Sequence, residues 1–562
     1  MRRLVAAVVV AVLAAGAAAY ALRQDDDSSA RERAQAPTLE KMAGDAGAQM
    51  MGMLKRGNVP GRSGDIALLP KPHFYLGPEG DLTNYETARP PTFTSHPNPW
   101  DYLARIPLVM YGPGFVEEGK RYFGKGIDLT DVAPTYARLL GMEDFQAQGR
   151  PLQRGIRYDR PPPRLIFTIM IDGGGWNVLR RHPESWPNIR AIAAQGTLYT
   201  GATIGSFPAH TGPIHANLGT GFFPEQHGVA HNLHFQNADP QFLERPSLGD
   251  LWDEANGNRP IVGTLSVLSN HLAMIGHGAN RRGGDRDIGV VWNQDDQTWY
   301  TNETYYELPD YLVPLDSGRL KRYEKHMDGR DGFEDGVWFE TPIGELRKGL
   351  RRASTPAFVR YQGDDMMAIL ANEELGRDDV TDLFYLQLKS TDQAGHAWNM
   401  VNPEVGETLY ESDRQIGRIK AELDRRVGVG NYVLMIGADH GQQPLAQSVG
   451  GWMINSKELE RDLIAEFDSD FTVRSHYVNA VEPHELDLEE VARWLGTYTI
   501  GDNIPRGIPG ADRVGRGRLA ERVFAGAFPI AYLGELTAEH VAGFGAGEWP
   551  EGDLTRRRPT GL

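Results

Sequence analysis

Three short apolar runs in this chain have the pattern of buried strands. They are LIFTIMI at Leu165–Ile171, LFYLQL at Leu383–Leu388 and YVLMIG at Tyr432–Gly437. Each run is short, contains β-branched or aromatic residues and is bounded by polar residues or glycine, which favours strands of a largely parallel sheet over helices. The pattern therefore predicts an α/β fold, and the chemistry of such folds usually lies at the carboxyl ends of the strands.

Acidic residues and histidines follow directly after these runs. Asp172 follows the first run, Asp392 and His396 follow the second, and Asp439 and His440 follow the third. Carboxyl ends of neighbouring parallel strands share one edge of the sheet, so we expect these side chains to converge. Three adjacent carboxylates would repel one another unless cations lay between them. A site for two metal ions is the simplest prediction.

The stretch between the first two runs contains a motif, SFPAHTGPIHANLGTGFFPEQHGVAHN, at Ser206–Asn232. It resembles the signature of the alkaline phosphatase superfamily, and most closely its type I phosphodiesterase/nucleotide pyrophosphatase branch. The positions in register are Thr211, Pro213, His215, Thr220-Gly221, Pro224, His227-Gly228 and Asn232. In this register Thr211 is the nucleophile. Ser206 begins a similar Ser-Phe-Pro, but it would place the Thr-Gly pair five residues too late.

The resemblance implies a three-layer α/β/α sandwich around a large, mostly parallel sheet, with an insert or cap region. It also implies phosphoryl transfer through a phosphothreonine at Thr211, with Asn232 binding the same phosphoryl group. A threonine hydroxyl is a weak nucleophile near neutral pH, and coordination to a metal ion is one way to activate it. A helix starting at Thr211, as Pro213 allows, would add amide donors for a phosphoryl oxygen. Taken alone, such a threonine is more often a simple helix cap.

The resemblance further implies seven protein ligands for two divalent metal ions, which we expect to be zinc. One ion is assigned to Asp172, Thr211, Asp439 and His440, and the other to Asp392, His396 and one more histidine. In the family this last histidine comes late in the chain and precedes a characteristic strand and helix. No such segment follows His440 here.

A segment of this kind lies near the N-terminus instead. His96 precedes IPLVMYGPG at Ile106–Gly114 and DVAPTYARLLG at Asp131–Gly141. We therefore predict that the chain is circularly permuted relative to the family, with His96 as the seventh ligand, because sheet assembly depends on spatial neighbours and not on chain order. The chain departs from the family in having Pro97 where glycine is usual. His476 and His540 remain competing candidates.

Composition agrees with an exported enzyme. Arg2 and Arg3 precede an apolar stretch, Leu4–Leu22, which predicts a secretory signal or a signal anchor, and hence an extracytoplasmic protein with a possible membrane tether. The chain has no cysteine, which excludes disulfides, thiolate ligands and a cysteine nucleophile. A net charge of −17 argues against a nucleic-acid scaffold as partner.

Five parts are expected along the 562 residues. They are a signal segment at 1–24, a polar N-terminal arm at 25–84, the relocated module at 85–155, a catalytic core at 160–500 with an insert at 233–382, and a C-terminal extension at 501–562. Val523–Leu533 is expected to be an added edge strand or closing segment. Aromatic residues of the insert, such as Trp292 and Trp299, could stack on a substrate, although ordinary packing is the commoner role.

The substrate is expected to be a small phosphate ester. Related zinc monoesterases use a Lys-x-Arg pair, and the matching segment here has Ser269 and His271 in those places. Loss of a bidentate guanidinium penalises a dianionic monoester more than a diester, so the sequence favours phosphodiesters or pyrophosphates. A phosphomonoesterase and a non-catalytic envelope binding protein remain alternatives. A mutase of the same superfamily would need a serine nucleophile, which Thr211 disfavours.

Overall fold

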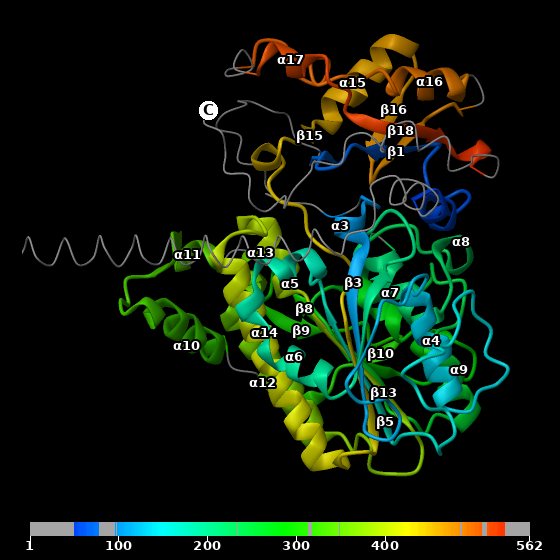
Figure 1. Cartoon of the computed structure of the whole chain (residues 1–562), viewed down its shortest axis with the longest axis vertical. Coiled ribbons are helices and arrows are strands. Elements are labelled where there is room, and N and C mark those ends of the chain that lie inside the picture. The colour runs from blue at the N-terminus through cyan, green and yellow to red at the C-terminus, as the bar shows by residue number, and fades with distance from the viewer. Residues whose placement is uncertain are drawn as a thin grey trace, which may run out of the picture.

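The computed structural model describes residues 50–77, 96, 98–232, 234–312, 317–347, 349–483, 486–508 and 514–533. Its centre is one ten-stranded sheet (Figure 1). The strands are β3 (Arg105–Tyr111), β4 (Lys120–Tyr122), β5 (Leu165–Ile171), β6 (Thr197–Thr203), β7 (Val262–Leu265), β8 (Asp287–Asn293), β9 (Thr298–Tyr300), β10 (Tyr306–Glu307), β13 (Asp382–Leu388) and β14 (Tyr432–Gly437). Their order is β10-β8-β7-β13-β5-β14-β3-β6-β4, and β9 pairs with β8. The three runs predicted as strands are β13, β5 and β14, which are adjacent and parallel.

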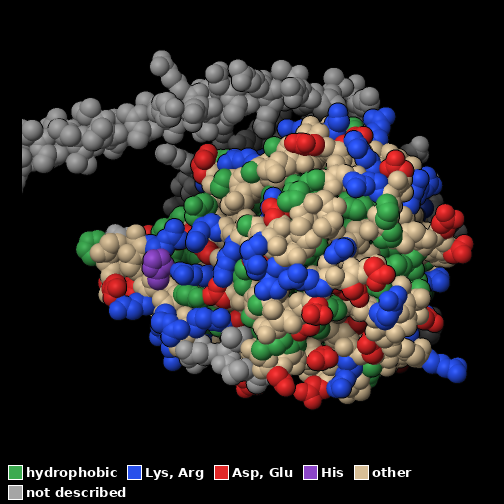
Figure 2. All heavy atoms as spheres, turned by 90° about the horizontal axis from the view of Figure 1, so that it is seen from below, with side chains coloured by type: hydrophobic (Ala, Val, Ile, Leu, Met, Phe, Trp, Pro, Cys, Tyr) green, Lys and Arg blue, Asp and Glu red, His purple; other side chains and the backbone are tan. Residues whose placement is uncertain are grey.

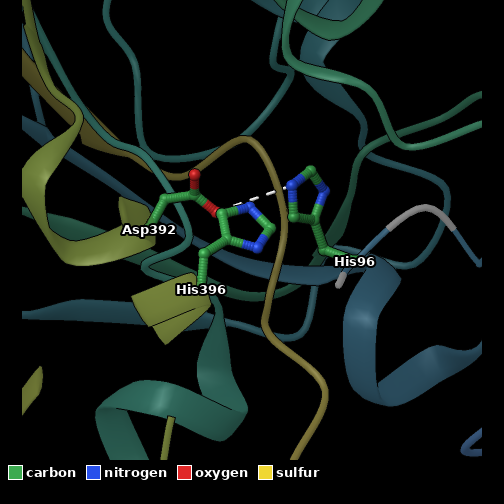
Figure 3. Close-up of side chains that lie close together, drawn as sticks. All are labelled: His96, Asp392 and His396. Carbon is green, nitrogen blue, oxygen red and sulfur yellow. Dashed lines mark ion pairs between the residues drawn. The ribbon is translucent and has the colours of Figure 1, made fainter. Parts of the chain in front are cut away.

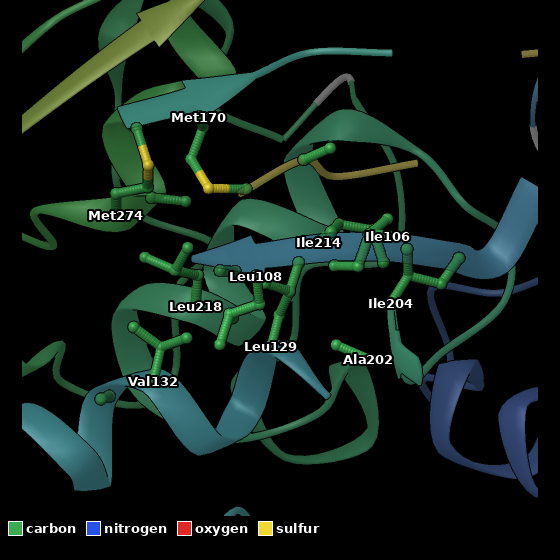
Figure 4. Packing of buried hydrophobic residues seen from close by; sticks show 14 of the residues in the cluster. Ile106, Leu108, Leu129, Val132, Met170, Ala202, Ile204, Ile214, Leu218 and Met274 are labelled. Carbon is green, nitrogen blue, oxygen red and sulfur yellow. The ribbon is translucent and has the colours of Figure 1, made fainter. Parts of the chain in front are cut away.

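Helices cover both faces of this sheet (Figure 1). One face carries α6 (Pro187–Ala194), α12 (Pro356–Asn372) and α14 (Pro403–Leu423), and the other carries α4 (Val132–Leu139), α7 (Thr211–Thr220) and α9 (Leu248–Asn256). Side chains alternate along a strand, so β5 sends Phe167 and Ile169 into the first layer and Ile166 and Met170 into the second. Figure 4 shows the second layer, where Met170 lies among residues from β3, α4 and α7. The predicted α/β fold with a large, mostly parallel sheet is confirmed.

Strand β3 interrupts the parallel arrangement within the sheet, and β9 is antiparallel to β8 at one side. Strand β3 lies between β14 and β6 and is antiparallel to both, with Leu108 opposite Gly437 and Tyr111 opposite Leu434. Because β3 runs against β14, it begins where β14 ends. The segment that precedes β3, including α3 (Asp101–Ala104), therefore lies at the edge of the sheet where β5 and β14 terminate.

A second, four-stranded antiparallel sheet packs above the first (Figure 1). Its order is β16-β17-β1-β18, and the strands are β1 (Ile66–Pro70), β16 (Phe471–Arg474), β17 (Tyr477–Ala480) and β18 (Phe524–Pro529). Helices α15 (Ser456–Phe467) and α16 (Leu488–Leu495) complete its core. The remaining elements are β2 (Tyr75–Leu76), α5 (Trp176–Arg181), α8 (Pro224–His227), α10 (Ser317–Asp328), β11 (Val337–Trp338), β12 (Thr341–Pro342), α11 (Ile343–Leu346), α13 (Ser390–Trp398), β15 (Met453–Ile454) and α17 (Arg516–Leu519), together with short 3-10 turns.

The boundaries between the parts of the chain differ from those expected from the sequence. The expected polar arm at 25–84 supplies β1, in which every residue is buried, and the expected extension at 501–562 supplies β18 as the edge strand beside it. Part of the expected insert at 233–382 is not a cap, because β7, β8 and β10 belong to the central sheet. β7 and β10 are short, and β7 pairs with β13, which is distant in sequence. The signal segment and the first residues of the relocated module lie outside the described residues.

The aromatic residues of the 233–382 region are mostly packing residues. Trp292 and Trp299 are buried and meet edge to face, with their ring centroids 5.1 Å apart, against Phe358 and Tyr361 of α12. Among the described residues, no helix has the length and apolar character needed to cross a bilayer. Figure 2 shows Lys and Arg side chains lying among Asp and Glu on the face below the central sheet.

Candidate metal and nucleophile site

The three carboxylates that follow the central strands converge at one end of the sheet. Asp172 comes directly after β5, Asp439 lies two residues beyond β14, and Asp392 lies in the first turn of α13, which follows β13. All three have no exposed surface. Buried carboxylates need partners, because an isolated buried charge is strongly unfavourable.

Asp392 lies beside two histidines, and these three residues form the first ligand group. His96 Nε2 is 3.5 Å and His396 Nε2 is 3.3 Å from Asp392 Oδ1 (Figure 3). His96 Nδ1 lies 2.9 Å from the carbonyl oxygen of Ala209, which can only accept, so Nδ1 carries the proton and the lone pair of Nε2 faces Asp392. Two imidazoles and a carboxylate within 4.8 Å of one another fit a divalent ion such as zinc.

The second ligand group contains Asp172, Asp439 and His440. His440 Nε2 lies 3.4 Å from Asp172 Oδ1 and 3.3 Å from Asp439 Oδ2. His440 Nδ1 is 2.9 Å from the carbonyl oxygen of Gly441, which fixes the proton on Nδ1 and leaves Nε2 as a possible ligand. His440 Nε2 and Asp439 Oδ2 are buried and have no hydrogen-bond partner, which is the state expected of atoms that bind an ion. These two atoms are therefore the part of the second group that could bind a metal.

Thr211 is the first residue of α7, as its sequence context predicted, and its side chain is buried. The helix start is held by Asn232, whose Oδ1 accepts a hydrogen bond of 2.8 Å from the backbone N–H of Gly212. Thr211 Oγ1 accepts a hydrogen bond of 3.2 Å from Lys389 Nζ. The nucleophile candidate thus lies at a helix N-terminus beside the carboxylates, where an anionic group is favoured.

Lys389 was missed by sequence reasoning, although it belongs to the centre of the site. It follows β13 directly, and its Nζ lies 2.9 Å from Asp172 Oδ1 and 2.7 Å from Asp392 Oδ2. The available signal was a lysine between an apolar strand and Asp392, because a charged residue there is carried to the end of a buried strand.

Asp172 has two more partners that fix its orientation. Its Oδ2 accepts hydrogen bonds from Gln387 Nε2 at 2.7 Å and from His271 Nε2 at 3.3 Å. His271 Nδ1 accepts from the backbone N–H of Leu268, so the proton of this imidazole is on Nε2. His271 therefore positions Asp172, and in this tautomer it is not a metal ligand. His215 lies against it, with ring centroids 4.7 Å apart, and points its free Nε2 into the same region.

The charges of the site are strongly coupled. Burial acts to raise the pKa of Asp392, but His396 and Lys389 hold it well below the usual range. Burial together with repulsion by Asp172 raises the pKa of Asp439 well above its usual range. Burial lowers the pKa of His440 to about 4, so this imidazole is neutral near pH 7. Neutral imidazoles and an under-compensated carboxylate are the state in which a cation binds most readily.

All predicted site residues are therefore found together. His96 lies beside Asp392 and His396, although it is far away in sequence, and its ring stacks on His440 with centroids 3.5 Å apart. The competing His476 lies elsewhere, against the rings of Phe207 and His210. His540 lies outside the described residues.

Comparison with known proteins gives one family for this chain. The family model of type I phosphodiesterase/nucleotide pyrophosphatase matches residues 166–494. Alkaline phosphatase PafA of Elizabethkingia meningoseptica is 24% identical over 339 residues, which cover 52% of this chain and 61% of that protein. Ectonucleotide pyrophosphatase/phosphodiesterase family member 7 of Homo sapiens is 21% identical over 285 residues, covering 51% of this chain and 49% of that protein.

A crystal structure of wild type alkaline phosphatase PafA has a TM-score of 0.48 and 19% sequence identity to this chain. The match covers 62% of this chain and 82% of that structure. The chain spans about three fifths of the length of its alkaline phosphatase relatives. The family match contains the three central strands, the Thr211 motif and six of the seven predicted ligands, but not His96. The chain belongs to the type I phosphodiesterase/nucleotide pyrophosphatase family.

Proposed function

We propose that this protein is a metal-dependent hydrolase that cleaves phosphodiester or pyrophosphate bonds of small molecules through a phosphothreonine on Thr211. The observation that carries the proposal is the position of Thr211 Oγ1, at the start of α7 and next to the carboxylates at the strand ends. A bound divalent ion at His96, Asp392 and His396 would act as a Lewis acid toward the phosphoryl group. The two imidazoles favour zinc.

In this mechanism the Thr211 oxygen attacks phosphorus, the bond from phosphorus to the leaving oxygen breaks, and the hydroxyl proton is transferred to the leaving oxygen. The backbone N–H groups at the start of α7 face the phosphoryl oxygens, and Asn232 keeps this turn in place through Gly212. Water then attacks the phosphothreonine and releases the product. The burial of Thr211 excludes bulk water during the first step.

The preference for diesters follows from the charges near the nucleophile. The expected cation positions hold Ser269 and His271, and His271 Nε2 is already bonded to Asp172. Lys389 donates hydrogen bonds to Asp172 and Thr211 and forms an ion pair with Asp392, so its ammonium group is already held by three oxygens. None of these groups offers a free donor to the extra oxygen of a monoester dianion.

The experiment is a comparison of kcat/KM for bis-nitrophenyl phosphate and nitrophenyl phosphate with the metal-loaded full chain. A higher value for the diester supports the proposal. An equal or higher value for the monoester contradicts it and favours a phosphomonoesterase, the activity that the name of PafA states for that relative.

We also propose that the chain is circularly permuted. Support comes from β3 and α4, which precede the family match in sequence but lie in the central sheet and its helical layer. The segment before β3 places His96 next to Asp392. In an unpermuted chain, a segment that follows the core in sequence would place the corresponding histidine there. Replacement of His96, described below, tests this assignment.

An extracytoplasmic location is proposed from Leu4–Leu22, which follows Arg2 and Arg3 and lies outside the described residues. A reporter fused after residue 60 should be active outside the cytoplasm. Activity in the cytoplasm alone would contradict the proposal.

A further inference from the structure

Lys389 is a buried cation in a place where the family resemblance leads one to expect a metal ion. Its side chain is 5% exposed, and its ammonium group has three oxygen neighbours. They are Asp172 Oδ1 at 2.9 Å, Asp392 Oδ2 at 2.7 Å and Thr211 Oγ1 at 3.2 Å. The ammonium group donates hydrogen bonds to Asp172 and Thr211 and forms an ion pair with Asp392.

The two ligand groups are unequally affected by this lysine. In the first group, Lys389 touches only Oδ2 of Asp392, and Oδ1 remains directed at His96 and His396. On the other side, Lys389 donates to Asp172 Oδ1 of the second group and to Thr211 Oγ1, and these two residues are half of the four expected to bind one ion. The ammonium group therefore competes with an ion at the second group more than with an ion at the first.

Building on the function proposed above, we infer that Lys389 takes the place of one of the two divalent ions, and that this enzyme works with a single divalent ion at His96, Asp392 and His396. Lys389 is then a catalytic residue, because it touches the reacting oxygen of Thr211. It holds this oxygen by a charge-assisted hydrogen bond and places a fixed positive charge beside the phosphoryl group that Thr211 receives.

Two atoms of the second group make the number of bound ions a direct test of this inference. Asp439 Oδ2 and His440 Nε2 have no hydrogen-bond partner, and they lie 3.3 Å from each other. They are the atoms that a second ion would use if Lys389 left the site. A count of ions per chain therefore separates the two arrangements directly.

The experiment uses tag-free full-length protein that has been stripped with a chelator, reloaded with excess Zn²⁺ and freed of unbound ions. Zinc per chain is measured by mass spectrometry of the element. Wild-type protein should hold about one ion, and Lys389→Ala, which opens the place of the ammonium group, should hold about two. Lys420→Ala is the matched control, since Lys420 pairs with Asp424 at the end of α14, and this variant should stay at one ion.

Two ions in the wild-type protein would overturn the inference while leaving the proposed function intact, and this count needs no variant. One ion in a folded Lys389→Ala protein, checked by circular dichroism, would also overturn it. A wild-type protein with no zinc and no hydrolysis of the diester would instead refute the proposed function.

Discussion

Strand β13 has a buried aspartate near each end, and the two are held in different ways. At the start of the strand, Asp382 accepts hydrogen bonds from the backbone N–H groups of Ile261 at 2.7 Å and Gly376 at 2.6 Å. Beyond the other end, Asp392 meets only side chains that carry or can carry charge, namely His96, His396 and Lys389, and the amide of Gln442.

The difference appears in the proton affinities. Burial raises the pKa of Asp382 to about 6, because its partners are neutral, whereas cationic neighbours hold the pKa of Asp392 well below its usual range. A carboxylate tied to backbone amides connects loops and serves the fold. A carboxylate that contacts histidines and a lysine from separate segments is suited to bind a metal ion, which is the role expected of Asp392.

The largest effect on turnover is expected from replacing Thr211, which lies in the site near Asp392. Thr211→Ala removes the attacking oxygen, so turnover of the diester should fall by about a thousandfold or more. Thr211→Ser should retain activity, because it keeps the hydroxyl. Turnover and zinc content are to be measured together, since the variant should still bind the ion of the first group.

Ser206→Ala is the matched control for Thr211. The Ser206 hydroxyl accepts a hydrogen bond from Asn217 Nδ2 and is the alternative nucleophile of the motif. Its replacement should change turnover only a few-fold. Loss of activity in Ser206→Ala with retention in Thr211→Ala would reverse the alignment of the motif.

A smaller but still large effect is expected from His96. His96→Ala removes one of the three protein ligands of the first group, and zinc affinity should fall by at least about 100-fold. Competition with a chromogenic chelator measures this affinity. His476→Ala is the control, because His476 packs against Phe207 and His210 and touches none of the ligands. If His476→Ala loses zinc and His96→Ala does not, the permutation is wrong.

The smallest effect is expected at the structural end of β13, and it concerns stability. The folded pKa of Asp382, about 6, lies above its ordinary value of 3.8, so the unfolded chain releases this proton first as pH rises. Asp382 therefore lowers the free energy of unfolding between about pH 4 and pH 6, by up to about 3 kcal/mol. Asp382→Asn should show a smaller loss of stability over this range than the wild type.

Urea unfolding at pH 4.5 and pH 7 measures that difference, and turnover per folded molecule should be unchanged. A variant with the same pH slope as the wild type would show that Asp382 does not titrate in this window. A variant with normal stability but impaired turnover would remove the distinction between the two ends of the strand.

The three central strands and the helix of the candidate nucleophile could be predicted from sequence, because the patterns that indicate them are local. Leu165–Ile171 and Tyr432–Gly437 have the predicted bounds of β5 and β14, and Leu383–Leu388 misses only the first residue of β13. The Thr211 helix start was readable for the same reason, since Pro213 and the spaced motif lie within one segment.

The rest depends on partners that are far apart in the chain. β1 is only IALLP, and nothing within this run identifies β17 and β18 as its neighbours. Lys389 escaped prediction because its role arises only when Asp172, Thr211 and Asp392 are brought around it. The sequence alone does not indicate which residues a lysine at the end of a strand will contact.

The pairing of β1 with β18 has a consequence for how the chain is made. Ile66 lies opposite Pro529, so one of the first strands to be synthesised waits for one of the last. β3 likewise needs β14, which is translated much later. The cost of closing such long loops slows these pairings, and neither sheet can be finished before β14 and β18, respectively, have been synthesised. The nascent chain should therefore remain incompletely folded and accessible to export factors or chaperones for much of its synthesis, which would suit the extracytoplasmic location proposed above.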